Sequence, residues 1–259
     1  MNEFLTIITP TFNRKELLSQ LKISLDNQCN FNFIWRIIDD GSTDETEKLC
    51  ADWLNNKKYK IEYYKCSNGG KHKAINFGMK SINTLLTVII DSDDVCKPNF
   101  ISEISQAHST YSKNKIIGCY SFLCENKHGE ILPTKFPYTG IVDRHYNLTY
   151  KYNVHGDKVD IYYTKILQKY PFPEFSNEKF ITEELLWNRI AKEYKKVGIN
   201  SSILVHDYYP GGLTSQYENL LRKNKKGAIL YFKERARLKI SIIMRLRSIY
   251  SIIKLNFYK

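Results

Sequence analysis

The sequence predicts an α/β protein whose mostly parallel sheet carries helices on both faces, followed by a basic amphipathic helical tail. Apolar, β-branched segments alternate with segments of helical periodicity about four times within the first 100 residues. Clusters of polar residues directly follow these predicted strands. Positive charge is concentrated at the C-terminal end of the chain.

Short apolar runs that stop at polar residues predict the first four strands. They are residues 4–9, 33–38, 60–65 and 85–90. Helices are expected over residues 14–27, 43–54 and about 71–82, with Ser42 or Thr43 capping the second. The polar clusters after the strands should share one edge of the sheet, where ligands bind in such folds.

The second half of the chain is less regular. Residues 116–124 predict a strand, residues 181–195 a helix and residues 202–206 a short strand. Residues 125–160 are rich in Gly, Pro, His and Tyr, which favours loops or hairpins. We therefore expect one domain over residues 1–220 and a helical tail over 221–259.

The charge distribution separates the body from the tail. Residues 222–259 contain 12 basic residues and one acidic residue, a net charge of +11. Residues 1–221 contain 27 basic and 26 acidic residues, a net charge of +1. A nearly neutral body argues against nucleic acid as a partner, and the tail is typical of a local basic anchor.

The six cysteines are spread singly and form no C-x-x-C pair, so neither a zinc site nor a disulfide framework is indicated. The N-terminal segment lacks the basic start and long apolar stretch of a signal peptide. No run reaches the roughly 18 apolar residues that span a bilayer. These features favour free thiols in a reducing cytoplasm.

Three carboxylates, Asp91, Asp93 and Asp94, follow the most apolar strand. Such a cluster repels itself unless a cation neutralises it, and a hard divalent ion with a bound diphosphate does so. Strand alternation should point Asp91 and Asp93 the same way. The alternative is a solvated turn in which an aspartate caps the next helix.

Two further clusters offer groups for a nucleotide. Asp39 and Asp40 end the second strand, where a carboxylate can accept hydrogen bonds from a base or a ribose, or can simply shape the turn. Phe12 is suited to pack on a base. Lys71, His72 and Lys73 follow Gly69-Gly70 and are placed to reach a phosphate, and the alternative is a solvated basic helix start. No dinucleotide or P-loop motif is present.

The segments TIITPTFNR, IIDDGSTDET, NGGKHKAINFGMKSI and VIIDSDD occur in this order and spacing. Together they resemble family 2 of the glycosyltransferases, strongly over residues 4–100 and more weakly over 101–215. The resemblance implies the GT-A fold, an inverting reaction and a nucleotide-sugar donor, with UDP the commonest carrier. It assigns residues 1–100 to the nucleotide-binding half and 101–220 to the acceptor half.

The resemblance also implies roles for residues of this chain. Donor-site positions are Pro10, Thr11, Phe12, Asp39, Asp40, Lys71, Asp91 and Ser92. Asp91 and Asp93 would form the D-x-D element that holds Mn²⁺ or Mg²⁺, with Asp93 nearest the ion. His206 is a further candidate ligand, although a lone histidine is more often structural.

The late acidic motif of the family, often Glu-Asp, supplies the catalytic base. This chain reads Thr182-Glu183-Glu184 instead, which leaves two glutamates as candidates. Adjacent helix residues point about 100° apart, so only one can face the sugar. We prefer Glu183 because the spacing between this residue and Trp187 is the same as in many members of the family. The alternative for either glutamate is a structural role, because the helix dipole favours acidic side chains at a helix N-terminus.

Residues 233–257 place a set of apolar side chains on one helical face, flanked by basic residues. The set is Ile242, Ile243, Leu246, Ile249, Tyr250, Ile253 and Phe257. This pattern is typical of a helix lying on anionic lipid, and the alternative is packing on the domain or a partner chain. A lipid-linked glycan acceptor in bacterial surface polysaccharide synthesis, at the inner face of the membrane, would explain such a tail.

Two other functions remain possible from the sequence. A sugar nucleotidyltransferase would carry a Gly-rich basic loop after the first strand, which TPTFNR lacks. A non-catalytic subunit with the same fold would not need acidic residues at positions 91, 93, 183 and 184. The sequence does not identify the sugar, the acceptor linkage or the oligomeric state.

Overall fold

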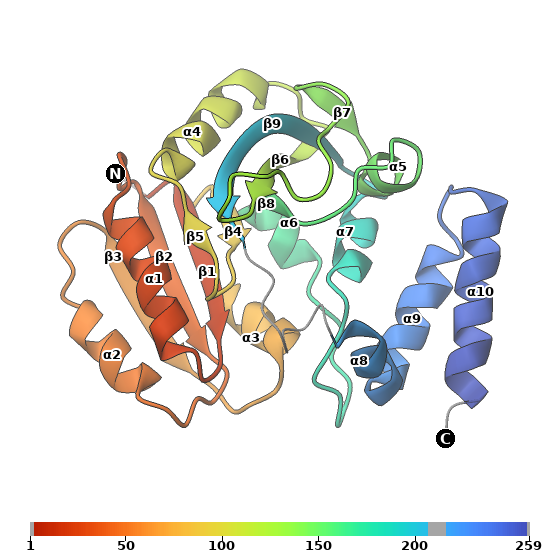
Figure 1. Ribbon diagram of the computed structural model, residues 1–259, viewed down its shortest axis with the longest axis horizontal. Coiled ribbons are helices and arrows are strands. Elements are labelled where there is room, and N and C mark those ends of the chain that lie inside the picture. The colour runs from red at the N-terminus through yellow and green to blue at the C-terminus, as the bar shows by residue number, and fades with distance from the viewer. Residues whose placement is uncertain (1–2, 207–215, 258–259) are drawn as a thin grey trace.

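The computed structural model describes residues 3–206 and 216–257, which form one mixed sheet flanked by helices (Figure 1). The strands are β1 Leu5–Thr11, β2 Phe33–Asp39, β3 Lys60–Lys65, β4 Leu86–Ile89, β5 Val95–Cys96, β6 Ile117–Glu125, β7 Ile141–Asp143, β8 Lys158–Tyr163 and β9 Lys195–Val205. The helices are α1 Lys15–Asp26, α2 Thr46–Trp53, α3 Lys71–Gly78, α4 Phe100–Tyr111, α5 His145–Tyr150, α6 Thr164–Lys169, α7 Glu184–Ile190, α8 Tyr217–Lys223, α9 Lys225–Arg235 and α10 Ile242–Phe257.

The strand order is β3-β2-β1-β4-β8-β6-β9-β5, with β7 pairing beside β9. Strands β3, β2, β1 and β4 are mutually parallel, and β6 is parallel to β9. Strand β8 runs antiparallel to both of its neighbours, β4 and β6. The carboxyl ends of β1, β2, β3 and β4 therefore meet at one edge, as the sequence predicts.

Each face of the sheet has its own core, because successive side chains of a strand point to opposite faces. On β1, Ile7 packs into a cluster with α1 and α4, whereas Ile8 packs into a cluster with α3, α6, α7 and α9. Both isoleucines are fully buried. The predicted α/β architecture with helices on both faces is confirmed.

The second half of the chain differs from the sequence-based expectation. Strand β8 lies in the middle of the sheet, although residues up to 160 were expected to form loops or hairpins. Its alternation of buried Val159 and Ile161 with the charged Lys158 and Asp160 was a usable signal. Helix α7 ends at Ile190 and β9 begins at Lys195, because these residues complete the sheet beside β6.

Two helix termini also differ. Helix α2 begins at Thr46, and the carboxylate of Asp44 accepts hydrogen bonds from the Thr46 N–H and hydroxyl. The expected cap at Ser42 or Thr43 is therefore wrong, since Ser42 instead accepts a hydrogen bond from the N–H of Asn13. Helix α3 ends at Gly78, where the chain packs closely against Ile38.

The expected tail divides into two parts. Helix α9 packs on α7 and buries Ala228, Tyr231 and Phe232 in the core. Helix α10 stands beside α9 at the end of the molecule (Figure 1) and buries only Ser248 and Leu255 fully. The segment 233–257 is therefore not one helix, and the expected apolar face from Ile242 to Phe257 lies on α10. No helix within residues 3–206 and 216–257 is long and apolar enough to cross a membrane.

The loop before α3 requires glycine at one position. Gly70 has a φ of 97° and a ψ of 154°, a combination that is essentially restricted to glycine. A Cβ atom at this position would overlap the backbone carbonyl of Lys179, which crosses over the start of α3. The segment that leads to Glu183 is therefore seated directly on Gly70.

We predict that Gly70→Ala lowers the free energy of unfolding by about 3 kcal/mol or more, from backbone strain plus steric overlap. Gly129→Ala is the matched control, because Gly129 has a φ of 80° but no atom within 4 Å of an added Cβ. Strain alone should cost the control about 1 kcal/mol. Urea unfolding measures both values, and equal losses would show that the contact with Lys179 contributes nothing.

Candidate active site

A cavity of about 500 Å³ opens at the carboxyl edge of the sheet. Its walls come from the start of α3, the turn after β4, the segment before α7 and the residues that precede β8. Asp91, Lys71 and Glu183 line it together, although they are far apart in the sequence. The cavity has the position and size of a ligand site in an α/β fold.

The loop after β1 forms one border of this edge. Strand β1 continues through Pro10. Its pairing with β4 ends at Ile8 and Ile89, and Pro10 faces the β4 side beyond that point. The N–H group that proline lacks would therefore have no hydrogen-bond partner in the sheet. Thr11 is buried, and its hydroxyl has no hydrogen-bond partner within the described part of the chain. Phe12 is 44% exposed. Of the two side chains, that of Phe12 is open to solvent, whereas the Thr11 hydroxyl is covered.

Asp39 and Asp40 are engaged in holding loops. Asp39 is fully buried and accepts hydrogen bonds from the Ser42 N–H and the Tyr63 hydroxyl, so it shapes the turn, and its expected contact with a nucleoside stays a prediction. Asp40 accepts the N–H groups of Gly69 and Gly70 at 2.7 and 2.8 Å. Burial raises the pKa of Asp40, although these two hydrogen bonds oppose the rise.

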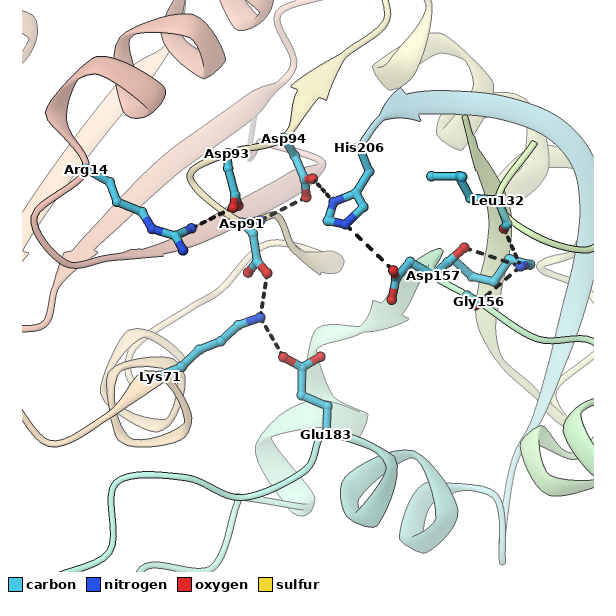
Figure 2. A network of polar contacts seen from close by, with 11 residues as sticks. Arg14, Lys71, Asp91, Asp93, Asp94, Leu132, Gly156, Asp157, Glu183 and His206 are labelled. Atoms are coloured by element: carbon cyan, nitrogen blue, oxygen red, sulfur yellow. Dashed lines mark hydrogen bonds and ion pairs between the residues drawn. The ribbon is translucent and has the colours of Figure 1, made fainter. Parts of the chain in front are cut away.

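The carboxylates after β4 diverge (Figure 2). Asp91 contacts Lys71 at 2.7 Å, whereas Asp93 contacts Arg14 at 2.7 Å. The expectation that Asp91 and Asp93 point the same way is wrong, because β4 ends at Ile89 and the two residues lie in a turn. Ser92 is buried within that turn. Arg14 was not singled out from the sequence, although it ends the TPTFNR segment.

Lys71 joins the two halves of the site. Its ammonium contacts Asp91 at 2.7 Å and Glu183 at 2.7 Å. Burial lowers the pKa of Lys71, but the two carboxylates raise it further, so the lysine is charged. Burial raises the pKa of Asp91, and Lys71 lowers it below its usual value. The solvated helix start considered for Lys71 is therefore excluded.

The two candidate glutamates face different surroundings. Glu183 reaches into the cavity and contacts Lys71. Glu184 accepts hydrogen bonds from the hydroxyls of Tyr150 at 2.7 Å and Tyr231 at 2.5 Å, which tie α7 to α5 and α9. Both glutamates line the cavity, but the two oxygens of Glu184 also hold α5 and α9, whereas Glu183 contacts Lys71.

His206 forms an ion pair at the end of β9. Its Nδ1 lies 2.5 Å from Asp94 and its Nε2 lies 3.7 Å from Asp157. Burial lowers the pKa of His206, but Asp94 and Asp157 raise it to about 9, so the ring is protonated at neutral pH. In this structure the ring pairs with Asp94 and Asp157, and the expected role of His206 as a metal ligand stays a prediction.

The loop that carries Asp157 was not foreseen from the sequence. The ammonium of Lys158 donates to the carbonyl oxygens of Leu132, His155, Gly156 and Asp157 at 2.8–3.3 Å (Figure 2). This arrangement fixes Asp157 against His206 and links the acceptor half of the chain to the turn after β4. A single feature of the sequence indicated this loop, which was the acidic Asp157 next to Gly156 in the irregular segment 125–160.

The carboxylates beside the cavity are the groups of this site that could hold a divalent cation. Across residues 3–206 and 216–257, no group of three or more His, Cys, Asp or Glu residues is arranged to hold a metal ion. Asp91 and Asp93 nevertheless offer hard oxygen ligands beside the cavity, and their present partners are cations. Magnesium sites commonly use one or two carboxylates plus substrate phosphates. The residues therefore fit an ion that is shared with a bound diphosphate.

Comparisons with solved structures agree with the fold. The structure of residues 1–349 of Staphylococcus aureus TarS has a TM-score of 0.65 at 18% identity, covering 98% of this chain and 72% of that one. The mannosyltransferase PcManGT of Pyrobaculum calidifontis has a TM-score of 0.63 at 15% identity, covering 98% and 70%. At such identities the likeness shows the GT-A fold alone.

Sequence comparisons give the family. The abequosyltransferase RfbV of Salmonella typhimurium is 36% identical over 89 residues, which cover 34% of this chain and 24% of that protein. The chain spans 40% or less of the length of the first three curated relatives it matches. The family model described as "Glycosyl transferase family 2" matches residues 6–165, more than half of the 259 residues. The chain therefore belongs to glycosyltransferase family 2.

Proposed function

We propose that this protein is an inverting, metal-dependent glycosyltransferase that moves a sugar from a nucleoside diphosphate to a hydroxyl of a glycan. The observation that carries the proposal is the meeting of Asp91 and Glu183 at one cavity through Lys71. One carboxylate belongs to the turn beside the proposed diphosphate, and the other to the start of α7. Such a pair suits a donor on one side and an acceptor on the other.

The donor is proposed to be a UDP-sugar. TarS has been solved in complex with UDP-GlcNAc and with UDP, and PcManGT with GDP-Man and Mn²⁺. In this chain the exposed Phe12 and the unpartnered hydroxyl of Thr11 lie at the border where the nucleoside would sit. Lys71 and Arg14 are the cations nearest the proposed diphosphate, and both now hold carboxylates.

The reaction needs a base, because an acceptor hydroxyl is a poor nucleophile. Glu183 takes the hydroxyl proton while the oxygen attacks the anomeric carbon, and the bond to the diphosphate breaks on the opposite side. One displacement inverts the configuration. Lys71 holds Glu183 in place until the substrates arrive. A divalent ion, Mn²⁺ or Mg²⁺, shared by Asp93, Asp91 and the diphosphate would stabilise the charge on the leaving group.

The acceptor is proposed to be a lipid-linked glycan in bacterial surface polysaccharide synthesis. TarS is a poly(ribitol-phosphate) β-N-acetylglucosaminyltransferase, and RfbV is an abequosyltransferase, so relatives of this chain act in such pathways. A lipid-linked acceptor would lie at the inner face of the cell membrane, in contact with the cytoplasm. We propose that the protein works there as a peripheral protein.

Helix α10 supports that location. Its seven outward apolar side chains, from Ile242 to Phe257, are 46–83% exposed, whereas Ser248 and Leu255 on the opposite face are buried. The helix is anchored from behind, since Arg235 of α9 donates a hydrogen bond to the Ser248 hydroxyl at 2.8 Å. A contiguous apolar face of this kind marks an interaction surface.

The charges around this face select an anionic bilayer over a protein partner. Five basic residues on or just before α10 are exposed: Arg237, Lys239, Arg245, Arg247 and Lys254. No acidic residue occurs between residues 236 and 257. Each Lys or Arg near an anionic membrane contributes about 1 kcal/mol of attraction. A second copy of the same face would instead place like charges together.

We predict that Glu183→Gln lowers kcat about 10²–10⁴-fold, while the affinity for the nucleoside diphosphate changes little, because only the base is lost. Glu184→Gln should lose less activity and mainly lower the melting temperature, because it weakens the bonds to Tyr150 and Tyr231. Transfer assays with a UDP-sugar panel and calorimetry measure both. The reverse pattern would make Glu184 the base, and full activity in both variants would contradict the mechanism.

We predict that the double variant Ile243→Glu plus Leu246→Glu reduces sedimentation with phosphatidylglycerol-containing vesicles at least about tenfold, because both side chains would enter the bilayer. Ile23→Glu plus Leu54→Glu is the matched control: these residues are also exposed, and the charge change is the same. The control should sediment like the wild type. Equal binding by both double variants would contradict the proposal, as would equal binding to phosphatidylcholine vesicles. A dimer lost only in the α10 variant would assign the face to a second copy.

A further inference from the structure

His72 is a buried polar side chain at the proposed donor site that neither the proposed mechanism nor the packing uses. It lies in the first turn of α3, directly after Lys71, and is only 3% exposed. Its ring lines the same cavity as Asp91 and Glu183. Neither Nδ1 nor Nε2 has a hydrogen-bond partner among residues 3–206 and 216–257.

Two unsatisfied nitrogens on one buried ring require an explanation. Buried polar groups in native proteins are nearly always hydrogen-bonded, and an unpartnered one destabilises the fold. The wall beside His72 is apolar, because Ile75 and Ile89 line the cavity next to it. The cavity that His72 lines is the nearest space from which a ligand can supply a partner for the ring.

The ionisation state of the ring narrows the ligand chemistry. Burial and, to a smaller extent, the nearby Lys73 lower the pKa of His72 to about 4, so the ring is neutral at neutral pH. A neutral imidazole has one N–H donor and one acceptor nitrogen. This combination matches hydroxyl groups, which both donate and accept, better than it matches the anionic oxygens of a diphosphate.

Lys71, the residue before His72, indicates which part of the donor each of the two side chains would contact. The ammonium of Lys71 lies between Asp91 and Glu183, where the diphosphate and the reactive carbon meet in the proposed function. The next side chain of α3 that lines the cavity is His72. A sugar whose anomeric carbon lies near Glu183 would thus present its hydroxyls to this part of the wall.

We propose that His72 is a specificity-determining residue that hydrogen-bonds a hydroxyl of the transferred donor sugar. The inference rests on the proposed function, and it specifies the sugar as the part of the donor that His72 contacts. Lys71 recognises charge, whereas His72 recognises the pattern of hydroxyls. The ring contacts the sugar and not the nucleoside diphosphate.

The test compares two ligands that differ only by the sugar. Calorimetry measures the binding of UDP and of UDP-GlcNAc, UDP-glucose and UDP-galactose, with Mn²⁺, to the wild type and to His72→Ala. UDP should bind both proteins equally, whereas the best-bound UDP-sugar should bind His72→Ala about five- to thirtyfold more weakly. The preference among the three sugars should narrow in the variant.

His72→Asn serves as the rescue variant, because an amide also donates and accepts hydrogen bonds. It should recover part of the sugar-dependent affinity while leaving UDP binding unchanged. It also keeps the test usable if His72→Ala does not fold, and the melting temperature without ligand reports that directly. Lys73→Ala, on the same helix, is the control for changes in the charge and packing of α3.

Three results would overturn the inference. Equal weakening of UDP and UDP-sugars would give His72 a role in the diphosphate site or in folding. Unchanged affinity for every UDP-sugar would mean that a buried water satisfies the ring. Failure of the wild type to bind any of these ligands, or their GDP, CDP and dTDP counterparts, would overturn the proposed function itself, and with it this inference.

Discussion

The ammonium of Lys71, held between Asp91 and Glu183, is the interaction on which the rest of the site depends. It connects the turn after β4, which belongs to the predicted nucleotide half, with the segment before α7 in the other half. Two carboxylates at this distance from one cation would repel each other without it. The same contact lowers the pKa of Asp91 and so favours its ionised form, although burial opposes this effect.

Several structural features place Lys71 at that point. Asp40 at the end of β2 accepts the N–H groups of Gly69 and Gly70 and so fixes the turn before α3. Gly70 allows the backbone of Lys179 to cross the helix start in close contact. The segment that leads to Glu183 therefore rests on the loop between β3 and α3, which Asp40 holds. This close backbone contact and the apolar cluster that α3 shares with α7 together set the geometry of Lys71 and Glu183.

Much of the fold could be predicted from the sequence, because strands β1 to β4 and helices α1 to α3 follow simple local patterns. The convergence of residues 10–14, 39–44, 67–73 and 91–94 followed from parallel topology alone. The position of β8 could not be predicted in this way, since its pairing with β4 and β6 depends on contacts between distant segments. The ion pairs of Lys71, Arg14 and His206 were unpredictable for the same reason.

The helical tail shows a similar limit. Amphipathic periodicity identified the apolar face of α10, but it did not reveal that α9 belongs to the core. Tyr231 of α9 donates a hydrogen bond to Glu184, and Arg235 links the same helix to Ser248 of α10. The exposed face is thus connected to the helix that begins beside Glu183 through a short series of polar contacts. Such a connection appears only when the helices are placed in three dimensions.

The most direct test of the central claim is a thermal-shift scan with UDP, GDP, CDP and dTDP, each with and without Mn²⁺. The scan is repeated on Asp93→Ala and on Asp52→Ala, an exposed position on α2 away from the cavity. A ligand at about 100 times its Kd stabilises the folded state by about 2.7 kcal/mol. The account predicts a shift for one nucleotide that requires the metal, persists in Asp52→Ala and disappears in Asp93→Ala. No shift with any nucleotide, or a shift that Asp93→Ala retains in full, would contradict it.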